Sequence, residues 1–314
     1  MHDERAPRTQ SPRSLVDCLA HTVVGQQHVL EALTLALIAD GHVLLEGPPG
    51  LAKTLACRAL AEAAGGTFRR VQFTPDLLPS DIVGTRVFDQ RNAEFATVLG
   101  PIFANIVLAD EINRAPAKVQ SALLEGMQER QVTIGPATHA LPSPFIVLAT
   151  MNPLEAEGTY ALPLAQMDRF LMKVLVTYPS VDEELTILAR FSGAQPDLPL
   201  DVVSLEDVAR WRDEARQVHV EPRIARYVVD LTAATRLPHE YVERGASPRA
   251  TLALTALARA RAYLDGRAFV LPDDVKALAP AVLRHRLAFT YRVATDGVDV
   301  EALLGSIIAS VPAP

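Results

Sequence analysis

The octapeptide at residues 47–54 constrains this chain more than any other stretch. It reads Gly-Pro-Pro-Gly-Leu-Ala-Lys-Thr and lies between the apolar, β-prone run 42–46 and the helix-favouring run 55–64. Successive backbone N–H groups of a glycine-rich turn can surround an anion, and the N-terminus of the following helix adds partial positive charge. The sequence therefore predicts a phosphate-binding loop between a strand and a helix, with an ordinary strand–turn–helix corner carrying a surface lysine as the alternative.

The spacing in this loop matches the nucleotide-binding pattern G-x-x-x-x-G-K-[ST] except at residue 52, where alanine replaces the second glycine. Lys53 would reach the β- and γ-phosphates, and the Thr54 hydroxyl would coordinate Mg²⁺. We expect Ala52 to be tolerated because its φ is negative if it already belongs to the helix. The residues expected to contact the nucleotide are Gly47, Pro48, Pro49, Gly50, Leu51, Ala52, Lys53, Thr54 and Leu55.

Composition places the chain among globular proteins. It has 314 residues, of which 49% are hydrophobic and 21% charged, so one or two domains with substantial cores are expected. A net charge of −7 weighs against general nucleic-acid binding. Cys18 and Cys57 show no metal-ligand spacing, which argues against zinc sites and disulfide frameworks. We see neither a leader pattern nor a membrane-spanning apolar run, and therefore expect a soluble, cytoplasmic protein.

Apolar runs that alternate with helical patterns predict an α/β core. Such runs occupy residues 42–46, 68–73, 104–109, 145–149 and 171–176. This alternation favours a parallel sheet covered by helices on both faces, a three-layer αβα arrangement. Beyond Pro179 only helical periodicity remains, which predicts a second, all-helical domain. We therefore expect a flexible tail at 1–13, an α/β core at 14–180 and a helical domain at 181–314.

Two segments interrupt the alternation and read as β-hairpins. The first covers about residues 85–98 and turns near Asn92, and the second covers about 130–142 and turns near Gly135. Neither is needed for the core of an α/β sheet. Surface decoration is the alternative interpretation for both.

Acidic and amide side chains follow two of the expected strands. Asp110 and Glu111 come directly after the run 104–109, and Asn152 follows the run 145–149. Ligands of parallel sheets collect at the carboxyl ends of the strands, where the glycine loop also lies. Asp110 could hold Mg²⁺, Glu111 could polarise the attacking water, and Asn152 could orient that water. The alternative for Asn152 is a turn-forming residue before proline.

Two arginines are further candidates. Arg169 begins the last strand, and Arg249 lies in the first turn of a helix in the second domain. Planar guanidinium groups suit the charge that builds up during phosphoryl transfer. A structural pairing of Arg169 with Asp168 competes with this interpretation.

Several long strings, together with the loop, resemble the MoxR family of AAA+ ATPases. The resemblance covers about residues 20–290 and is specific to this family. The strings lie at residues 73–81 (FTPDLLPSD), 108–115 (LADEINRA), 120–129 (QSALLEGMQE), 157–163 (EGTYALP), 168–170 (DRF) and 283–286 (LRHR).

The resemblance implies roles for individual residues. Lys53 and Thr54 match the Walker A pair, and Asp110 and Glu111 match the Walker B pair. Asn152 then corresponds to sensor 1, Arg169 to the arginine finger acting on a neighbouring subunit, and Arg249 to sensor 2. The segment expected to pack against adenine is Val24, Gly25 and Gln26. The two hairpins match the helix-2 insert and the pre-sensor-1 hairpin.

The resemblance also implies an activity and partners. Such a protein hydrolyses Mg²⁺-ATP between the core and a helical lid, in a ring that is usually hexameric. Its output is remodelling or metal-loading of protein partners, often ones with a von Willebrand factor A domain. Gly126 departs from the family, where alanine is more usual, and is expected to weaken its helix by about 1 kcal/mol.

Rival functions stay open at this point. A nucleic-acid motor could use the hairpins, on which Arg86, Arg91 and Arg130 lie. A nucleotide-gated scaffold with little turnover is a second rival, although the intact Glu111 argues against it. A magnesium-chelatase-like subunit is a close relative within the enzyme class.

Overall fold

The computed structural model describes residues 11–152, 158–191, 198 and 202–314. The main-sheet strands are β1 (Val43–Glu46), β2 (Phe68–Gln72), β5 (Ile106–Asp110), β8 (Ile146–Met151) and β9 (Met172–Leu175). The helices among them are α1 (Pro12–Thr22), α2 (Gln27–Ile38), α3 (Lys53–Ala63), α4 (Pro79–Val83), α5 (Ala117–Glu129) and α6 (Leu164–Met167), with a 3-10 turn at Ile112–Arg114.

The five strands form one parallel sheet in the order β2-β5-β8-β1-β9. Neighbouring side chains on a strand point to opposite faces, so Val43 and Leu45 join one core and Leu44 joins the other. Both faces are covered, which explains why β5 and β8 are continuous apolar runs rather than alternating ones. The predicted α/β fold is confirmed.

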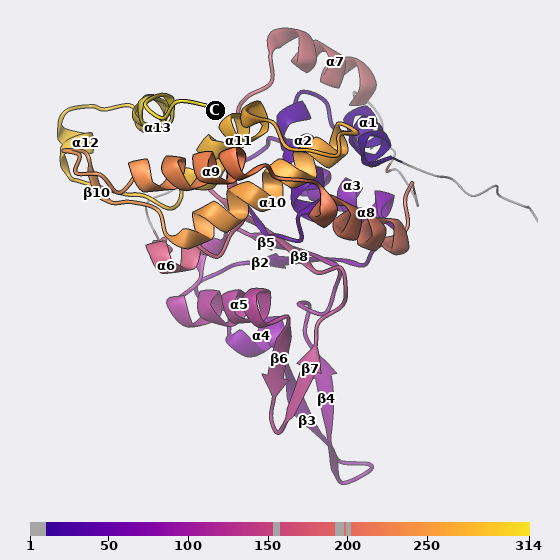
Figure 1. Ribbon diagram of the computed structural model, residues 1–314. Helices are drawn as coiled ribbons and strands as arrows, with labels where there is room; N and C mark the ends of the chain where they lie inside the picture. The colour runs from indigo at the N-terminus through magenta and orange to yellow at the C-terminus, as the bar shows by residue number, and fades with distance from the viewer. Residues whose placement is uncertain (1–10, 153–157, 192–197, 199–201) are drawn as a thin grey trace, which may run out of the picture.

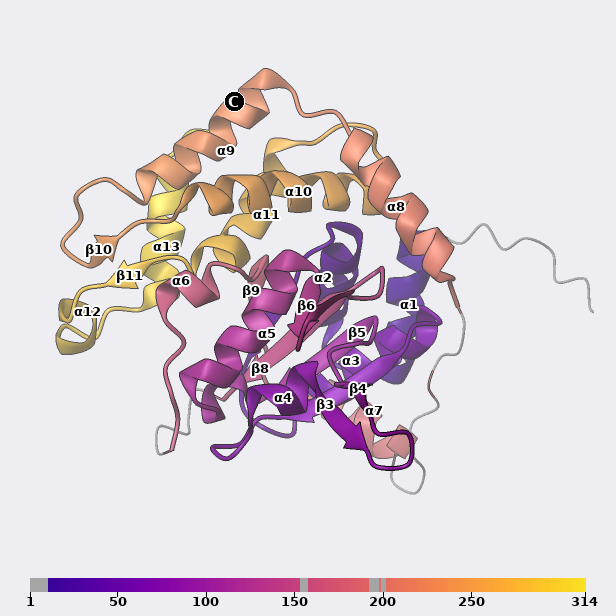
Figure 2. The same cartoon turned by 90° about the horizontal axis from the view of Figure 1, so that it is seen from below.

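Helices cover the two faces of the sheet unequally (Figures 1 and 2). Residues of α1, α2 and α3 pack on one face, in the same core that extends into the C-terminal helices. Residues of α5, together with Phe73 and Ile82, pack on the other face in a smaller core. The sheet therefore forms the middle of three layers, as expected from the sequence.

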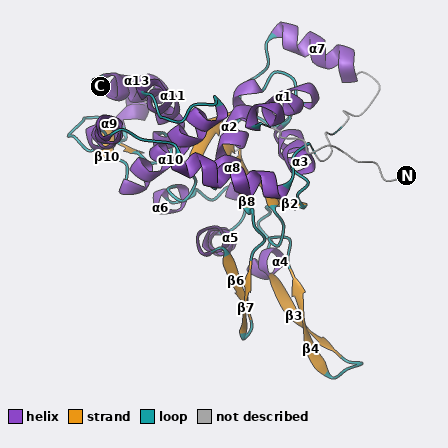
Figure 3. Ribbon diagram, turned by 45° about the vertical axis from the view of Figure 1, so that its right-hand side comes forward, coloured by secondary structure: helices purple, strands orange, loops and turns teal. Residues whose placement is uncertain are grey.

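Both predicted hairpins are present, and they project side by side from the core (Figure 3). One pairs β3 (Gly84–Asp89) with β4 (Glu94–Leu99), and the other pairs β6 (Gln131–Ile134) with β7 (Ala137–Ala140). Large apolar side chains on the first hairpin, Phe88 and Phe95 among them, are about half exposed. Surface decoration alone does not account for such exposure of aromatic rings.

The C-terminal part is helical, as predicted, and packs on α2 and on the edge strand β9. Its helices are α7 (Val181–Phe191), α8 (Leu205–Gln217), α9 (Pro222–Ala234), α10 (Pro248–Leu264), α11 (Pro272–Leu283), α12 (Arg292–Thr295) and α13 (Val300–Ala309). It also holds a feature that the sequence analysis missed, the short antiparallel pair β10 (Val242–Arg244) and β11 (Ala288–Phe289). Two- and three-residue strands are too short to show alternation.

At the N-terminus the prediction was wrong in one detail. Helix α1 begins at Pro12, with the Ser11 hydroxyl accepting a hydrogen bond from the Ser14 N–H, so residues 12 and 13 do not belong to the expected tail. Proline in the first turn costs the helix nothing, because its missing N–H would have no partner there. Residues 1–10 lie outside the described part, and the domain division at residue 180 stays a prediction. None of the described helices is long and apolar enough to cross a membrane.

Candidate nucleotide-binding site

The loop 47–52 joins β1 to α3 and depends on its glycines. A Cβ atom on Gly47 would lie 2.4 Å from the Val176 carbonyl oxygen, so no side chain fits there. Gly50 has φ +83°, in the left-handed region that glycine reaches without strain. The loop therefore follows a path that most other residues would resist.

Ala52 corrects one expectation. Its φ is +56° and its ψ is 18°, so it caps α3 in the left-handed conformation instead of lying inside the helix. The helix begins only at Lys53, because a residue in the left-handed conformation cannot belong to a right-handed helix. This is the position where the motif carries its second glycine, and alanine adopts it at a cost.

Lys53 lies at the first turn of α3 and points back over the loop. Its Nζ donates hydrogen bonds to the carbonyl oxygens of Gly47, at 2.5 Å, and Pro48, at 2.9 Å. Burial lowers the pKa of this ammonium group, and the nearby carboxylates of Asp110 and Glu111 oppose that shift. The cation is thus held by two carbonyl oxygens of its own loop, near the acids at the end of β5, which is separated from β1 by β8.

Asp110 is the last residue of β5 and Glu111 follows it, one residue later than the strand end expected from the sequence, and the two acids share one hydroxyl. The Thr150 Oγ1 donates to Asp110 Oδ1 at 2.6 Å and accepts from the Glu111 N–H at 2.8 Å. Glu111 itself has φ +57°, which turns its side chain away from the strand direction. Thr150 is fully buried at the end of β8, so it fixes the relative positions of the two acids.

Sequence reasoning missed two side chains on β2. Arg70 donates from Nε (3.0 Å) and Nη2 (2.6 Å) to Asp110 Oδ2, and the Gln72 amide donates to Glu111 Oε2 at 2.8 Å. Residues 70 and 72 lie on one face of a strand that pairs with β5, where Gln72 is in register with Asp110. The period-2 alternation of residues 68–73 indicates that residues 70 and 72 share one face of a strand. Only the strand order shows which acids these two side chains contact.

These groups surround a cleft of about 450 Å³. Its lining includes residues 49–55, Arg70, Asp110, Glu111 and 150–152, and Asn152 is buried there. Cationic Lys53 and Arg70, the Thr54 hydroxyl and the Asp110 carboxylate are the donor set that a magnesium nucleotide requires. Among the residues that the structure describes, all those lining this cleft belong to the α/β part.

The segment expected at adenine lies at the same edge of the sheet. The Gln26 side-chain amide donates to the Thr177 carbonyl oxygen at 3.0 Å, and Gly25, with φ +75°, packs against Pro179. Thr177 follows β9, the neighbour of β1, so the segment stands beside the loop. It is not part of the cleft lining, and contact with adenine stays a prediction.

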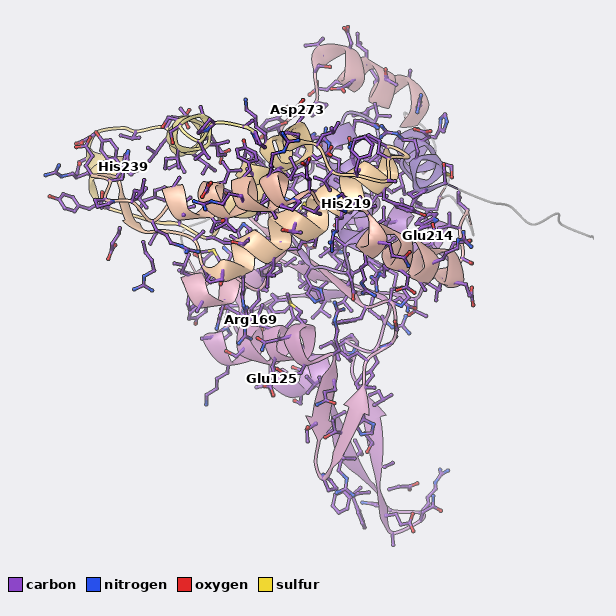
Figure 4. All side chains as sticks on the ribbon, in the orientation of Figure 1. Glu125, Arg169, Glu214, His219, His239 and Asp273 are labelled. Atoms are coloured by element: carbon purple, nitrogen blue, oxygen red, sulfur yellow. The ribbon has the colours of Figure 1, made fainter. Side chains whose placement is uncertain are left out.

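The two candidate arginines lie elsewhere. Arg169 and Arg249 line a second cleft, of about 360 Å³, that also includes Gly41 and His42 just before β1. Figure 4 labels Arg169 beside α5, below the C-terminal helices. The second cleft lies at the start of β1 and the loop lies at its end. The five residue steps from His42 to Gly47, at 3.3 Å each, separate the two by roughly 16 Å. Neither arginine can therefore reach the cleft of its own chain in this arrangement.

The comparisons with known proteins agree with this geometry. Residues 42–172 match the model of the ATPase family associated with various cellular activities (AAA), and residues 234–307 match the AAA lid domain. The chaperone MoxR1 of Mycobacterium tuberculosis is 49% identical over 300 residues, covering 93% of this chain and 79% of that protein. The chain belongs to the MoxR family of AAA ATPases.

Two other relatives are similar along nearly their whole length. The protein MoxR of Methylorubrum extorquens is 32% identical, with 94% of this chain and 93% of that protein covered. A crystal structure of a proposed ATPase from Cytophaga hutchinsonii superimposes with a TM-score of 0.90 at 42% identity, over 96% of this chain and 94% of that one. The family resemblance inferred from the motifs is thus confirmed.

Proposed function

We propose that this MoxR-family chain binds Mg²⁺-ATP in the cleft around the loop 47–54 and hydrolyses it as part of a ring. The observation that carries the proposal is the convergence of Lys53, from the start of α3, with Asp110 and Glu111, from the end of β5, on one cleft. In this assignment Lys53 holds the β- and γ-phosphates, while Thr54 and Asp110 hold the metal ion. Bound Mg²⁺ supplies charge neutralisation on the phosphates.

Glu111 polarises the attacking water in this proposal, and Asn152 orients it. Two contacts support the role of Glu111: its backbone is held by Thr150 and its carboxylate by Gln72. A carboxylate whose position is fixed at the cleft suits a general base, which typically contributes about 10²–10⁴-fold to a rate. An intact, positioned Glu111 also favours turnover over a nucleotide-gated scaffold.

Substitutions at the two ends of this mechanism separate binding from catalysis. Glu111→Gln should lower kcat by about 10²-fold or more while leaving affinity for a fluorescent ADP analogue unchanged. Lys53→Ala should abolish binding of the same analogue. Wild-type turnover in the Glu111→Gln variant would show that Glu111 is not the base.

Arg169 and Arg249 are proposed to act on the nucleotide of the next subunit. This changes the earlier expectation that ATP lies between the core and the lid of one chain, because the cleft lining contains core residues and Arg249 lines the opposite edge. A ring brings the arginine edge of one protomer against the loop edge of its neighbour. Hydrolysis then depends on assembly, and hexamers are the usual family arrangement.

Mixing variants tests this arrangement. Lys53→Ala subunits keep both arginines, and Arg169→Ala subunits keep the nucleotide cleft, so mixed rings should recover part of the hydrolysis that each variant lacks. Absence of recovery at every mixing ratio, with assembly verified by sedimentation, would argue against action between subunits.

The proposed output is remodelling, maturation or metal-loading of protein partners, including ones with a von Willebrand factor A domain. The name chaperone for a 49% identical relative supports a protein substrate. So does the β3–β4 hairpin, where Phe88 and Phe95 are exposed and Arg86 and Arg91 are balanced by Asp89 and Glu94. A nucleic-acid motor would need concentrated positive charge at that position.

Stimulation of the ATPase separates these two outputs. A protein that copurifies with the Glu111→Gln variant should raise wild-type kcat, and double-stranded or single-stranded DNA should not. Stimulation by DNA alone, lost on raising the salt concentration, would favour the nucleic-acid motor instead.

A further inference from the structure

The end of α11 is bonded to the segment that carries Arg169. The Nε2 atom of His285 is 3.1 Å from the carbonyl oxygen of Phe170. The Arg284 guanidinium donates a hydrogen bond to the carbonyl oxygen of Lys173 at 2.7 Å. Arg286 donates to the carbonyl oxygens of Phe170 and Leu171, at 2.5 and 3.1 Å. Three consecutive residues of the lid thus bond to the backbone at the start of the edge strand β9.

Asp168 is the side chain at the centre of this contact. Its Oδ1 accepts from Arg286 Nε at 2.9 Å, and its Oδ2 accepts from the Ser247 hydroxyl at 2.7 Å. The same Ser247 Oγ accepts a hydrogen bond from the backbone N–H of Arg249 at 3.1 Å. One carboxylate, adjacent to Arg169 in the chain, is therefore linked through a single hydroxyl to the backbone of Arg249.

The contact is largely buried. The Arg286 side chain is 2% exposed and that of Asp168 is 17% exposed. Burial lowers the pKa of Arg286 to about 10, and Asp168 opposes this shift. A buried cation that loses its carboxylate is strongly destabilised, so the pair holds lid and core in one relative position.

Because Asp168 is bonded elsewhere, it does not form an ion pair with Arg169. Sequence reasoning offered Asp168 as the partner of Arg169, but the carboxylate is bonded to Arg286 and Ser247. Within the described residues no ion pair is found for Arg169, whose side chain lines the second cleft with Arg249. The two guanidinium groups thus share a cleft while their backbones are joined through Asp168.

We propose that Asp168 is a positioning residue that fixes Arg169 and Arg249 as one unit for contact with the nucleotide of the neighbouring subunit. The inference rests on the proposed action of these arginines between subunits. Asp168 touches no nucleotide in this scheme. It acts by holding the start of β9 and the first turn of α10 together through Arg286 and Ser247.

The hydrolysis rate of mixed rings distinguishes a positioning role of Asp168 from a purely structural one. Asp168→Asn keeps the shape and removes the charge, and should lower kcat of the assembled protein about 10- to 100-fold, the effect of weakening a charged hydrogen bond. Affinity for a fluorescent ADP analogue should stay within about twofold, because the nucleotide cleft is intact. Mixing with Lys53→Ala should restore hydrolysis, whereas mixing with Arg169→Ala should not, because both variants are defective at the same edge.

Matched controls come from the first turn of α8, where a serine and an aspartate also bond to each other, but only within their own helix and its cap. Ser204 Oγ accepts from the Asp207 N–H and donates to the Asp207 carboxylate. Ser204→Ala and Asp207→Asn should therefore leave kcat unchanged. Ser247→Ala is the second test variant: it removes the hydroxyl but leaves the Asp168–Arg286 pair, so it reports on the link even if Asp168→Asn does not fold.

Wild-type kcat in folded, assembled Asp168→Asn and Ser247→Ala rings would overturn the positioning role. So would restoration of Asp168→Asn by Arg169→Ala. If Arg169→Ala itself hydrolysed ATP at the wild-type rate, the action between subunits would be wrong and the positioning role with it. Loss in Arg169→Ala without loss in Asp168→Asn overturns the positioning role alone.

Discussion

Replacing Ala52 with glycine should cost this protein far less stability than an alanine-to-glycine change elsewhere. At φ +56° an L-residue is about 1–2 kcal/mol less stable than in a right-handed conformation, and glycine removes that penalty. Against this gain stand about 0.4–1 kcal/mol of extra entropy in the unfolded chain and roughly 0.4 kcal/mol for a half-buried methyl group. The free energy of unfolding of Ala52→Gly should therefore change by between about −0.4 and about +1.2 kcal/mol.

Ala32 is the matched control. It is also partly buried and packs against the same core, but it lies in the middle of α2. Ala32→Gly should lower the free energy of unfolding by about 1–1.5 kcal/mol, because glycine is unfavourable inside a helix. Urea unfolding measured at a common m-value gives both free energies. Equal losses in the two variants would refute the strain assigned to residue 52.

Three other changes test the core and the site. The pKa of buried His42 is lowered to about 3, chiefly by burial, so the unfolded chain binds the extra proton below pH 6.5; stability should fall as pH drops from 6.5 towards 3, by up to ~1.4 kcal/mol per unit. Urea unfolding of His42→Gln should show a shallower pH dependence, and identical slopes would contradict this. Gly126→Ala should fail to stabilise, because the new Cβ lies 2.7 Å from Ile102 Cδ1 and overpacking offsets the ~1 kcal/mol of helix propensity; a gain near 1 kcal/mol would disprove the clash. Thr150→Val removes the hydroxyl shared by Asp110 and Glu111. It should lower the free energy of unfolding by about 1–3 kcal/mol and lower kcat more than nucleotide affinity, whereas unchanged stability and kcat would mean that the hydroxyl is dispensable.

Local patterns were enough to predict the five strands of the main sheet and the position of the two acids at the end of one of them. Continuous apolar runs gave β5 and β8, and the acids that follow β5 lie beside Lys53 as expected. Such features depend on the residues themselves and on the rule that the carboxyl ends of parallel strands lie at the same edge of the sheet. They need no knowledge of which strands are neighbours.

Features that depend on strand order or backbone handedness were not predictable. The contact of Arg70 with Asp110 requires β2 to lie next to β5, which period-2 alternation does not specify. The prediction of a negative φ at Ala52 was wrong. It followed the preference of alanine for negative φ, and the turn into α3 overrides that preference. Gly126 looked like a local weakness in α5, yet its missing side chain makes room for Ile102.

The charges at the two edges of the sheet are complementary in the proposed ring. Four arginines and two aspartates line the second cleft, and two of those arginines are paired, Arg130 with Asp40 at 3.1 Å and Arg286 with Asp168 at 2.9 Å. Among the residues that the structure describes, no acid pairs with Arg169 or Arg249, so their two positive charges share one cleft and repel each other. A triphosphate bound to the neighbouring protomer would balance these two positive charges. The length of β1 keeps both arginines away from the nucleotide cleft of their own chain. In the proposed ring, nucleotide binding at one edge and subunit contact at the other therefore stabilise each other, which couples assembly to hydrolysis.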